Sequence, residues 1–258
     1  MKKILKYIAI ILFATNLVSC DDDEFLTRES KDQLSSNLFW RDAADAKAAL
    51  TTAYSELEAR QNFWDGWQEG RSVVEWYRSD YMLPGVDGNN YAHWMSMFNG
   101  TYTNGHTFIN LLWKLNYKGL NYANQVIVNV DLMDDADISS AEKKQFIAEA
   151  TFLRAYYHFK LLTLYKQIVI RDGVVGEEDL DKALSTRAEA WTVILKDFEA
   201  AAANLPVSYP ASEVGRATKG AALAYLGKAY LHKAGDSEAS ETDDYKNAAD
   251  ALNEVVKL

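Results

Sequence analysis

The sequence predicts an all-α fold that is mostly helical and carries one aromatic-rich loop insert. Apolar side chains recur at steps of three and four residues over several long stretches, which is the spacing of one helix face. Two capping boxes of the S/T-x-x-E type stand directly before such stretches. Segments that alternate apolar and polar residues, as half-buried strands do, are nearly absent.

The first two helices are expected at 42–57 and at 111–130. In the first, small and apolar residues such as Ala46, Leu50 and Ala53 follow Asp42, a suitable N-cap. The second carries apolar residues from Leu112 to Val130, and we expect an interruption near Gly119, because glycine weakens a helix interior.

The strongest helix prediction begins at the capping box Ser139 to Glu142 and runs to Leu164. It has two apolar stripes rather than one, so we expect it to be buried between neighbouring helices. A second capping box, Thr186 to Glu189, opens a helix that ends at Leu205-Pro206. Between these helices, the segment 168–175 has β-branched residues around an Asp-Gly pair, which indicates a small hairpin or an extended turn.

Two further helices are predicted near the end of the sequence. The first has Thr218 as its N-cap and ends at Gly235. Residues 226–230, LGKAY, match the L-G-x2-Y core of a tetratricopeptide helix, and Ala248 or Ala249 supplies the small residue on the partner helix at 245–256. The fold is therefore expected to contain tetratricopeptide-like helix pairs. The periodic pattern is still running at Leu258, so we expect that the natural chain continues.

The N-terminus predicts an exported, lipid-anchored protein. Three lysines precede about a dozen apolar residues, which suits a secretory leader and is shorter than the ~20 residues of a membrane span. The following LVSC, 17–20, resembles the lipobox of bacterial lipoproteins, in which the cysteine is lipidated. Cys20 is the only cysteine, so it makes no internal disulfide. We expect a signal peptide at 1–19, a lipidated tether at 20–35 and a helical domain at 36–258.

The charge balance argues against nucleic acid as a ligand. Of 27 basic side chains the leader holds three, which leaves 24 against 37 acidic ones and a net charge of −13. Such a surface repels phosphate backbones, so we expect membrane attachment through lipid alone. The acidic run 21–24 is either a solvated linker or, by resemblance to some Bacteroidetes lipoproteins, an export signal to the outer face of the outer membrane.

Four segments together resemble the SusD/RagB family of nutrient-uptake lipoproteins. They are SNLFWRDAADAKAALTTAY at 36–54, EATFLRAYYHFKLLTLY at 149–165, STRAEAWTVILKDFEAAAANLP at 185–206 and GRATKGAALAYLGKAYL at 215–231. Lys166 and Val169 stand where the family usually has Gly and Pro, so this turn is expected to differ in shape. Family members are about twice as long, and the C-terminal half, which supplies part of their ligand-binding surface, is missing here.

The resemblance implies a lipoprotein of the outer membrane, facing the cell exterior. It would bind a nutrient polymer, oligosaccharide above all, and deliver it to a SusC-like TonB-dependent transporter. The resemblance implies no enzyme activity. An alternative hypothesis is a helical scaffold of the transporter complex that has no glycan site of its own.

The aromatic-rich insert, 63–117, holds the candidate binding residues. It contains 13 of the 32 aromatic residues and five of the seven tryptophans, and between Gly66 and Gly105 it is rich in Gly and Asn. Aromatic rings stack on the apolar faces of sugars, while amide and charged groups bond the hydroxyls. The predicted ligand-binding residues are Trp76, Arg78, Asp80, Tyr81, Asn89, Asn90, Tyr91 and Trp94. An aromatic in this insert can equally be core, and we assign Trp113 and Tyr117, which have helical spacing, to the core.

No cofactor, metal or catalytic motif is predicted. The four histidines are scattered, and the segment from Gly215 to Gly220 lacks the Lys and Ser/Thr of a P-loop. Asp135, Asp137 and Ser139 resemble the start of a calcium loop, but Ser140 replaces its glycine and Phe146 its final glutamate.

Overall fold

The computed structural model describes residues 39–58, 60–63, 66–69, 74–83, 85 and 92–258. Every element discussed below belongs to the compact unit Trp40–Leu258. The predicted signal peptide, the tether with Cys20, and the candidate residues Asn89, Asn90 and Tyr91 lie outside the described residues.

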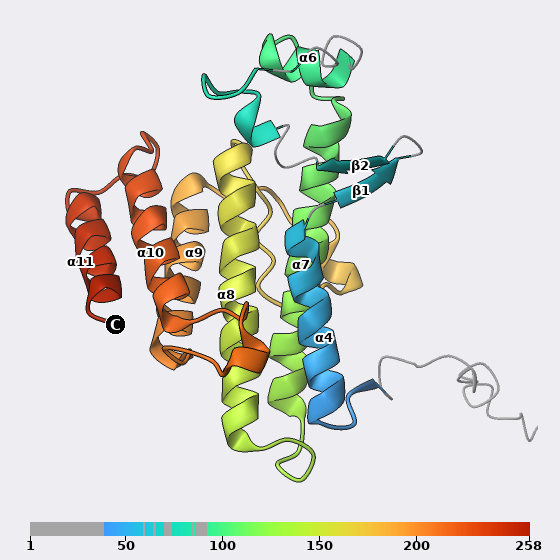
Figure 1. Ribbon diagram of the computed structural model, residues 1–258, viewed down its shortest axis with the longest axis vertical. Coiled ribbons are helices and arrows are strands. Elements are labelled where there is room, and N and C mark those ends of the chain that lie inside the picture. Colours follow the sequence, from blue (N-terminus) through green and yellow to red (C-terminus); the bar gives the residue numbers. More distant parts are fainter. Residues whose placement is uncertain (1–38, 59, 64–65, 70–73, 84, 86–91) are drawn as a thin grey trace, which may run out of the picture. The chain divides into compact units, whose positions relative to one another are not determined.

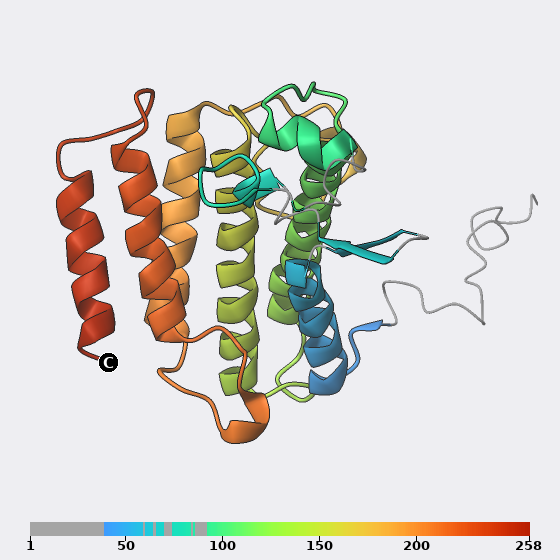
Figure 2. The same ribbon diagram turned by 45° about the horizontal axis from the view of Figure 1, so that its top comes forward.

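The prediction of a mostly helical fold is confirmed. The longer helices are α4 (Ala43–Ser55), α7 (Thr107–Leu132), α8 (Ser140–Leu164), α9 (Arg187–Asn204), α10 (Lys219–Ala234) and α11 (Asp244–Val256). Figures 1 and 2 show them side by side, with α8 between α7 and α9 and with α11 at one side. The short helices are α6 (Ala92–Phe98), η2 (Glu56–Glu58), η4 (Glu177–Asp179) and η5 (Ala211–Glu213).

A two-stranded hairpin that the sequence did not reveal opens the insert. Strands β1 (Arg60–Phe63) and β2 (Gly66–Glu69) pair antiparallel, with Arg60 opposite Glu69 and Phe63 opposite Gly66. Each strand is four residues long, so neither offers enough alternation to be detected from the sequence.

Four of the predicted helix starts are correct, whereas α7 starts at Thr107 rather than at the predicted residue 111. Each N-cap side chain accepts a hydrogen bond from a backbone N–H in the first turn of its helix. These caps are Asp42, Ser139, Thr186 and Thr218. Both capping boxes are complete, because Glu142 and Glu189 also accept from the N-cap backbone. Their boundaries fix the register of the buried stripes that follow.

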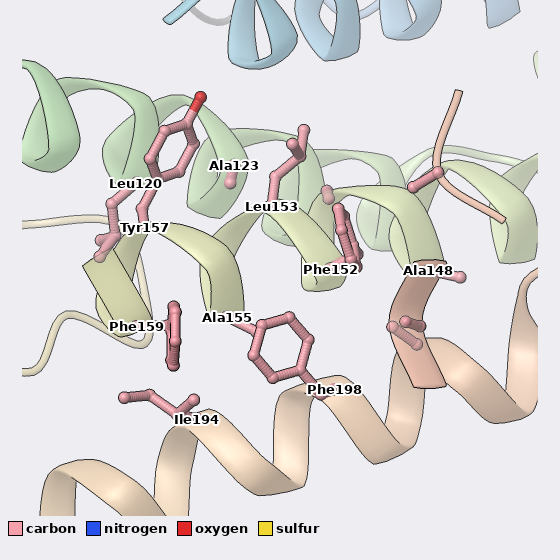
Figure 3. Close-up of a cluster of buried hydrophobic side chains, with 14 of the residues drawn as sticks. Leu120, Ala123, Ala148, Phe152, Leu153, Ala155, Tyr157, Phe159, Ile194 and Phe198 are labelled. Carbon is pink, nitrogen blue, oxygen red and sulfur yellow. The ribbon is translucent and has the colours of Figure 1, made fainter. Parts of the chain in front are cut away.

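Helix α8 is buried on both sides, as its two apolar stripes predict. Figure 3 shows Tyr157 directed towards Leu120 and Ala123 of α7, while Phe159 points towards Ile194 of α9. All five side chains are 2% exposed or less. Burying an aromatic or aliphatic side chain of this size stabilises the fold by ~1.5–3 kcal/mol, so α8 is the central support of the molecule.

The expected break at Gly119 is wrong, because α7 is one continuous helix of 26 residues. Gly119 lies against the ring of Tyr157, and a Cβ placed there would meet Tyr157 Cε1 at 2.7 Å. The glycine therefore serves close packing between α7 and α8. The Tyr157 hydroxyl donates a hydrogen bond to the Ala53 carbonyl of α4 at 2.6 Å. Tyr157 therefore joins α4 to the packing of α7 against α8.

The close approach expected between the last two helices is confirmed. A Cβ on Gly227 of α10 would meet the Ala248 carbonyl oxygen of α11 at 3.1 Å and Leu252 Cγ at 2.6 Å. The absence of a side chain at 227 thus lets the two backbones approach, as in a tetratricopeptide pair.

The segment 168–175 is extended and forms no strand, so it is the extended turn of the two predicted alternatives. Side chains of α7 and α8 hold its backbone. Asn124 Nδ2 donates to the carbonyls of Arg171 and Gly173, both at 2.9 Å, and Arg154 donates to the Asp172 carbonyl at 2.9 Å. The turn is therefore fixed along α7.

Several charged residues of the family-like motifs form buried ion pairs that join the helices. Arg154 of α8 binds Asp197 of α9 through two hydrogen bonds of 2.7 and 2.8 Å, and both side chains are largely buried. Arg187 binds Asp236 at 2.6 Å.

The third such pair joins α8 to the loop before α10. Glu149, fully buried, accepts from Tyr54 of α4 at 2.8 Å and from Arg216 Nε at 3.0 Å. Arg216 also faces the ring of Tyr209 at 4.6 Å. These pairs explain why the motifs contain charges at buried positions.

Candidate functional site

The candidate site begins with a short turn at 74–83 whose side chains alternate between inside and outside. Val74 is 3% exposed and Tyr77 is half-buried, whereas Trp76 is 52% exposed. The backbone carbonyl of Trp76 accepts from Ser79 N at 3.0 Å and from Ser79 Oγ at 2.6 Å. The turn is therefore closed on itself and presents Trp76 outwards.

A small second core holds this turn against α7. Its buried members are Val74, Met97 of α6, and Phe108 and Leu112 of α7. Tyr77 and Trp94 pack against it, and their ring centroids are 5.8 Å apart. This core is separate from the main core around α8, and it fixes the insert to the N-terminal end of α7.

His106 connects the two halves of this second core. Its Nδ1 accepts from the backbone N–H of Phe108 at 3.2 Å, which caps α7, and its Nε2 donates to the His93 carbonyl of α6 at 3.0 Å. Both bonds require the neutral imidazole with its proton on Nε2. Burial lowers the pKa of His106, which favours this neutral form.

Four of the predicted binding residues share the exposed turn. Trp76 and Tyr81, 52% and 97% exposed, flank Arg78 and Asp80, which are also exposed. The Arg78 guanidinium lies 5.4 Å from the centre of the Tyr102 ring, so part of its position is set by a cation–π contact. The turn therefore combines aromatic surface with a cation and a carboxylate.

Trp94 is placed differently from Trp76. It is half-buried on α6 and packs against the second core. The Trp94 ring contacts the exposed turn through Tyr77. Trp76 is thus the stronger candidate for a sugar platform, and Trp94 supports the insert from below.

One residue that positions the site was not predicted. Lys160 of α8 binds the carboxylate of Glu75 at 2.5 Å, and both side chains are largely shielded from solvent. This ion pair joins the residue next to Trp76 to the central helix. Sequence reasoning could not find it, because the partners are 85 positions apart and no local pattern links Glu75 to Lys160 of the segment 149–165.

Other kinds of site find no support among the residues that the structure describes. In that part of the chain, no three His, Cys, Asp or Glu side chains are grouped so that they could hold a metal ion. Within the same residues, no helix combines the length and the apolar character that a membrane span needs.

Comparison with protein families gives one match that covers most of the chain. Residues 24–231 match the model of the SusD-like family described as starch-binding and associating with the outer membrane. A SusD-like protein of Bacteroides ovatus is 29% identical over 133 residues, which are 51% of this chain and 24% of that protein.

Solved structures show the same fold. A SusD-like carbohydrate-binding protein of Bacteroides fragilis is 27% identical, with a TM-score of 0.64, and the match covers 85% of this chain and 41% of that one. A laminarin-binding SusD-like protein is 22% identical with a TM-score of 0.70, over 84% of this chain and 44% of its own. The chain thus spans less than half the length of these relatives.

Proposed function

Because this chain belongs to the SusD-like family, we propose that it binds a saccharide of a nutrient polymer through the exposed turn of its insert. The observation that carries the proposal is Trp76, 52% exposed on a turn that the second core and the Glu75–Lys160 ion pair hold in place. A fixed ring loses little conformational freedom when a sugar stacks on it. Relatives that are named for binding carbohydrate or laminarin support this choice of ligand.

The proposal includes the location of the protein in the cell and the transporter with which it acts. Residues 1–19 are a signal peptide, Cys20 carries the lipid, and 20–35 tether the helical domain to the outer membrane on the exterior side. The protein then delivers its ligand to a SusC-like TonB-dependent transporter and acts as a binding protein, not an enzyme. The family model's association with the outer membrane supports this location.

The test is a titration of the full-length mature protein with laminari-, xylogluco- and malto-oligosaccharides. We expect Trp76→Ala to weaken saccharide binding about tenfold or more. Stacking of a nucleic-acid base on an aromatic side chain is worth ~1–3 kcal/mol, and we use this value as the scale for a sugar ring, with ~1.4 kcal/mol for a tenfold change in affinity. The melting temperature should stay unchanged, because the ring is exposed. Tyr245→Ala, which removes a 63% exposed ring from α11, is the matched control and should bind normally.

Other outcomes would decide between the hypotheses. Full affinity in Trp76→Ala would contradict the proposed platform and favour the scaffold hypothesis. Trp94→Ala should lower the melting temperature, because this ring packs against the second core. A steady release of reducing ends during titration would instead place the protein among the hydrolases.

A further inference from the structure

A concave site lies on α7, beside the extended segment 168–175. It encloses about 400 Å³, which falls within the ~300–1,000 Å³ of small-molecule sites. Its walls come from α7 and from the returning segment, and they consist of Trp113, Tyr117, Leu120, Asn121, Val169, Arg171 and Val175. None of these residues belongs to the exposed turn with Trp76.

The aromatic wall is fixed before any ligand arrives. Trp113, Tyr117 and Asn121 are four residues apart and therefore form one stripe of α7. The rings of Trp113 and Tyr117 are 4.8 Å apart, and Tyr165 contacts Trp113 edge-on at 4.9 Å. The Tyr117 hydroxyl donates to the Val169 carbonyl at 2.9 Å and accepts from Val169 N at 2.8 Å. Burial raises the pKa of Tyr117 to about 12, so the hydroxyl stays protonated.

Trp113 and Tyr117 thus have two roles, of which only the core packing was predicted. Both pack against the main core, as predicted, and both also line the pocket while remaining half-buried. A helical stripe predicts which side chains share a face, but the pocket exists only because the segment 168–175 returns beside it.

The polar wall has donors that the protein itself does not use. Within the described part of the chain, neither the Asn121 amide nor the Trp113 indole N–H makes a hydrogen bond. Arg171 donates one side-chain N–H to the Asp179 carbonyl and, among the same residues, binds no carboxylate. By contrast, Arg154 and Arg187 each hold an acidic partner. Arg171 therefore keeps most of its five donors for a ligand.

We propose that this pocket is a second saccharide site that binds one sugar ring. The apolar face of the ring stacks on Trp113 and Tyr117, and its hydroxyls accept hydrogen bonds from Asn121 and Arg171. A ligand with an apolar face and several acceptor groups at its edge satisfies both walls. The proposal goes beyond the function proposed above, because it adds a site that shares no residue with the Trp76 turn.

The experiment uses the full-length mature protein with Trp76→Ala as background, so that the turn does not contribute. Calorimetric titration with laminari-, xylogluco-, malto- and galacturono-oligosaccharides measures the binding that remains. Asn121→Ala should weaken it about two- to tenfold, as expected for a lost neutral hydrogen bond. Arg171→Gln should weaken it about tenfold or more, because the charged donors are stronger.

Matched controls come from the same helix. Asn110→Ala removes an exposed amide of α7 outside the pocket, and Lys114→Gln removes an exposed cation one position from Trp113. Both should bind as the background does. Asn121→Ala should melt like its parent, since its side chain makes no hydrogen bond within the described residues, so a loss of affinity in it is not a folding effect.

The outcomes separate the two proposals. If wild type binds and Trp76→Ala retains no affinity, or if the remaining affinity survives both Asn121→Ala and Arg171→Gln, the second site is refuted and the Trp76 site stands. If wild type binds none of these saccharides, both proposals fail. Residual affinity that falls in the two pocket variants and not in the controls supports the second site.

Discussion

His158 shows how far a single side chain depends on its surroundings. It is 1% exposed on α8, and its Nε2 accepts a hydrogen bond from the backbone N–H of Arg171 at 3.1 Å. Burial, helped by the nearby charge of Arg154, lowers the pKa of His158 to about 3. The ring is therefore neutral in the folded protein and supports the segment that forms one wall of the pocket.

This burial predicts acid sensitivity. The unfolded chain has an ordinary histidine pKa of ~6.5, so between that pH and about 3 the unfolded state binds one more proton than the folded state. The free energy of unfolding should thus fall by ~1.4 kcal/mol for each pH unit of acidification in this window, and this contribution is fully present above pH ~6.5. Denaturant unfolding measured from pH 7 to 4 should show a shallower pH dependence for His158→Gln.

The control for this experiment is Asn110→Ala, which removes an exposed side chain of α7 that has no titratable group. Its pH profile should run parallel to that of wild type. Parallel profiles for His158→Gln as well would mean that His158 is not the group that must take up the proton.

Two of the five tryptophans of the insert, Trp76 and Trp94, mark the limit of prediction for single residues. Both stand among sugar-compatible neighbours, and the sequence does not distinguish them. Trp76 is exposed because Val74 and Tyr77 beside it face the second core, whereas Trp94 itself packs against that core. The difference arises from contacts with α7, at Phe108 and Leu112, which no local pattern contains.

The start of a helix, in contrast, can be determined by a few consecutive residues. A capping box needs only four consecutive residues, so α8 and α9 could be predicted to the residue. The predicted helix break at Gly119 was wrong because the reason for this glycine is its close contact with Tyr157, a residue of another helix. Elements are thus predictable where their causes lie within a few residues, and not where a packed partner decides.

The α10–α11 pair allows a test of helix packing with two glycines of one helix. Gly227→Ala should destabilise the protein by ~1–3 kcal/mol, because the new methyl group would overlap Leu252 and crowd the Ala248 carbonyl. Gly220→Ala should stabilise it by ~0.5–1 kcal/mol, since alanine favours the helix and a Cβ there meets Leu258 Cδ1 only at 3.5 Å. Thermal unfolding of both variants measures the difference, and equal shifts would argue against close α10–α11 packing.

At the scale of the whole molecule, the net charge bears on the membrane attachment proposed above. Without the proposed leader the chain carries a net charge of −13, so an anionic membrane surface would repel it. The proposed lipid on Cys20 would overcome this repulsion, since two or more acyl chains give stable anchoring at ~0.8 kcal/mol per buried CH₂.

This argument gives a fractionation experiment. Cys20→Ala should move the protein from the membrane fraction to the soluble fraction, and washing the wild type with high salt should not release it, since the proposed attachment is by lipid and not by charge. Mass spectrometry of the native N-terminus checks the modification directly. A Cys20→Ala protein that stays with the membrane would show that another contact holds it.

The buried carboxylate of Glu149 has a consequence for the order of folding. It is neutralised by Arg216, 67 positions further along the chain, while Tyr54 of α4 donates to the same group. A chain that is synthesised from its N-terminus has α4 and α8 before it has this arginine. Until then, closing these helices would bury a carboxylate without its cationic partner, which costs free energy. The junction thereby couples the stability of α4 and α8 to the loop that precedes α10.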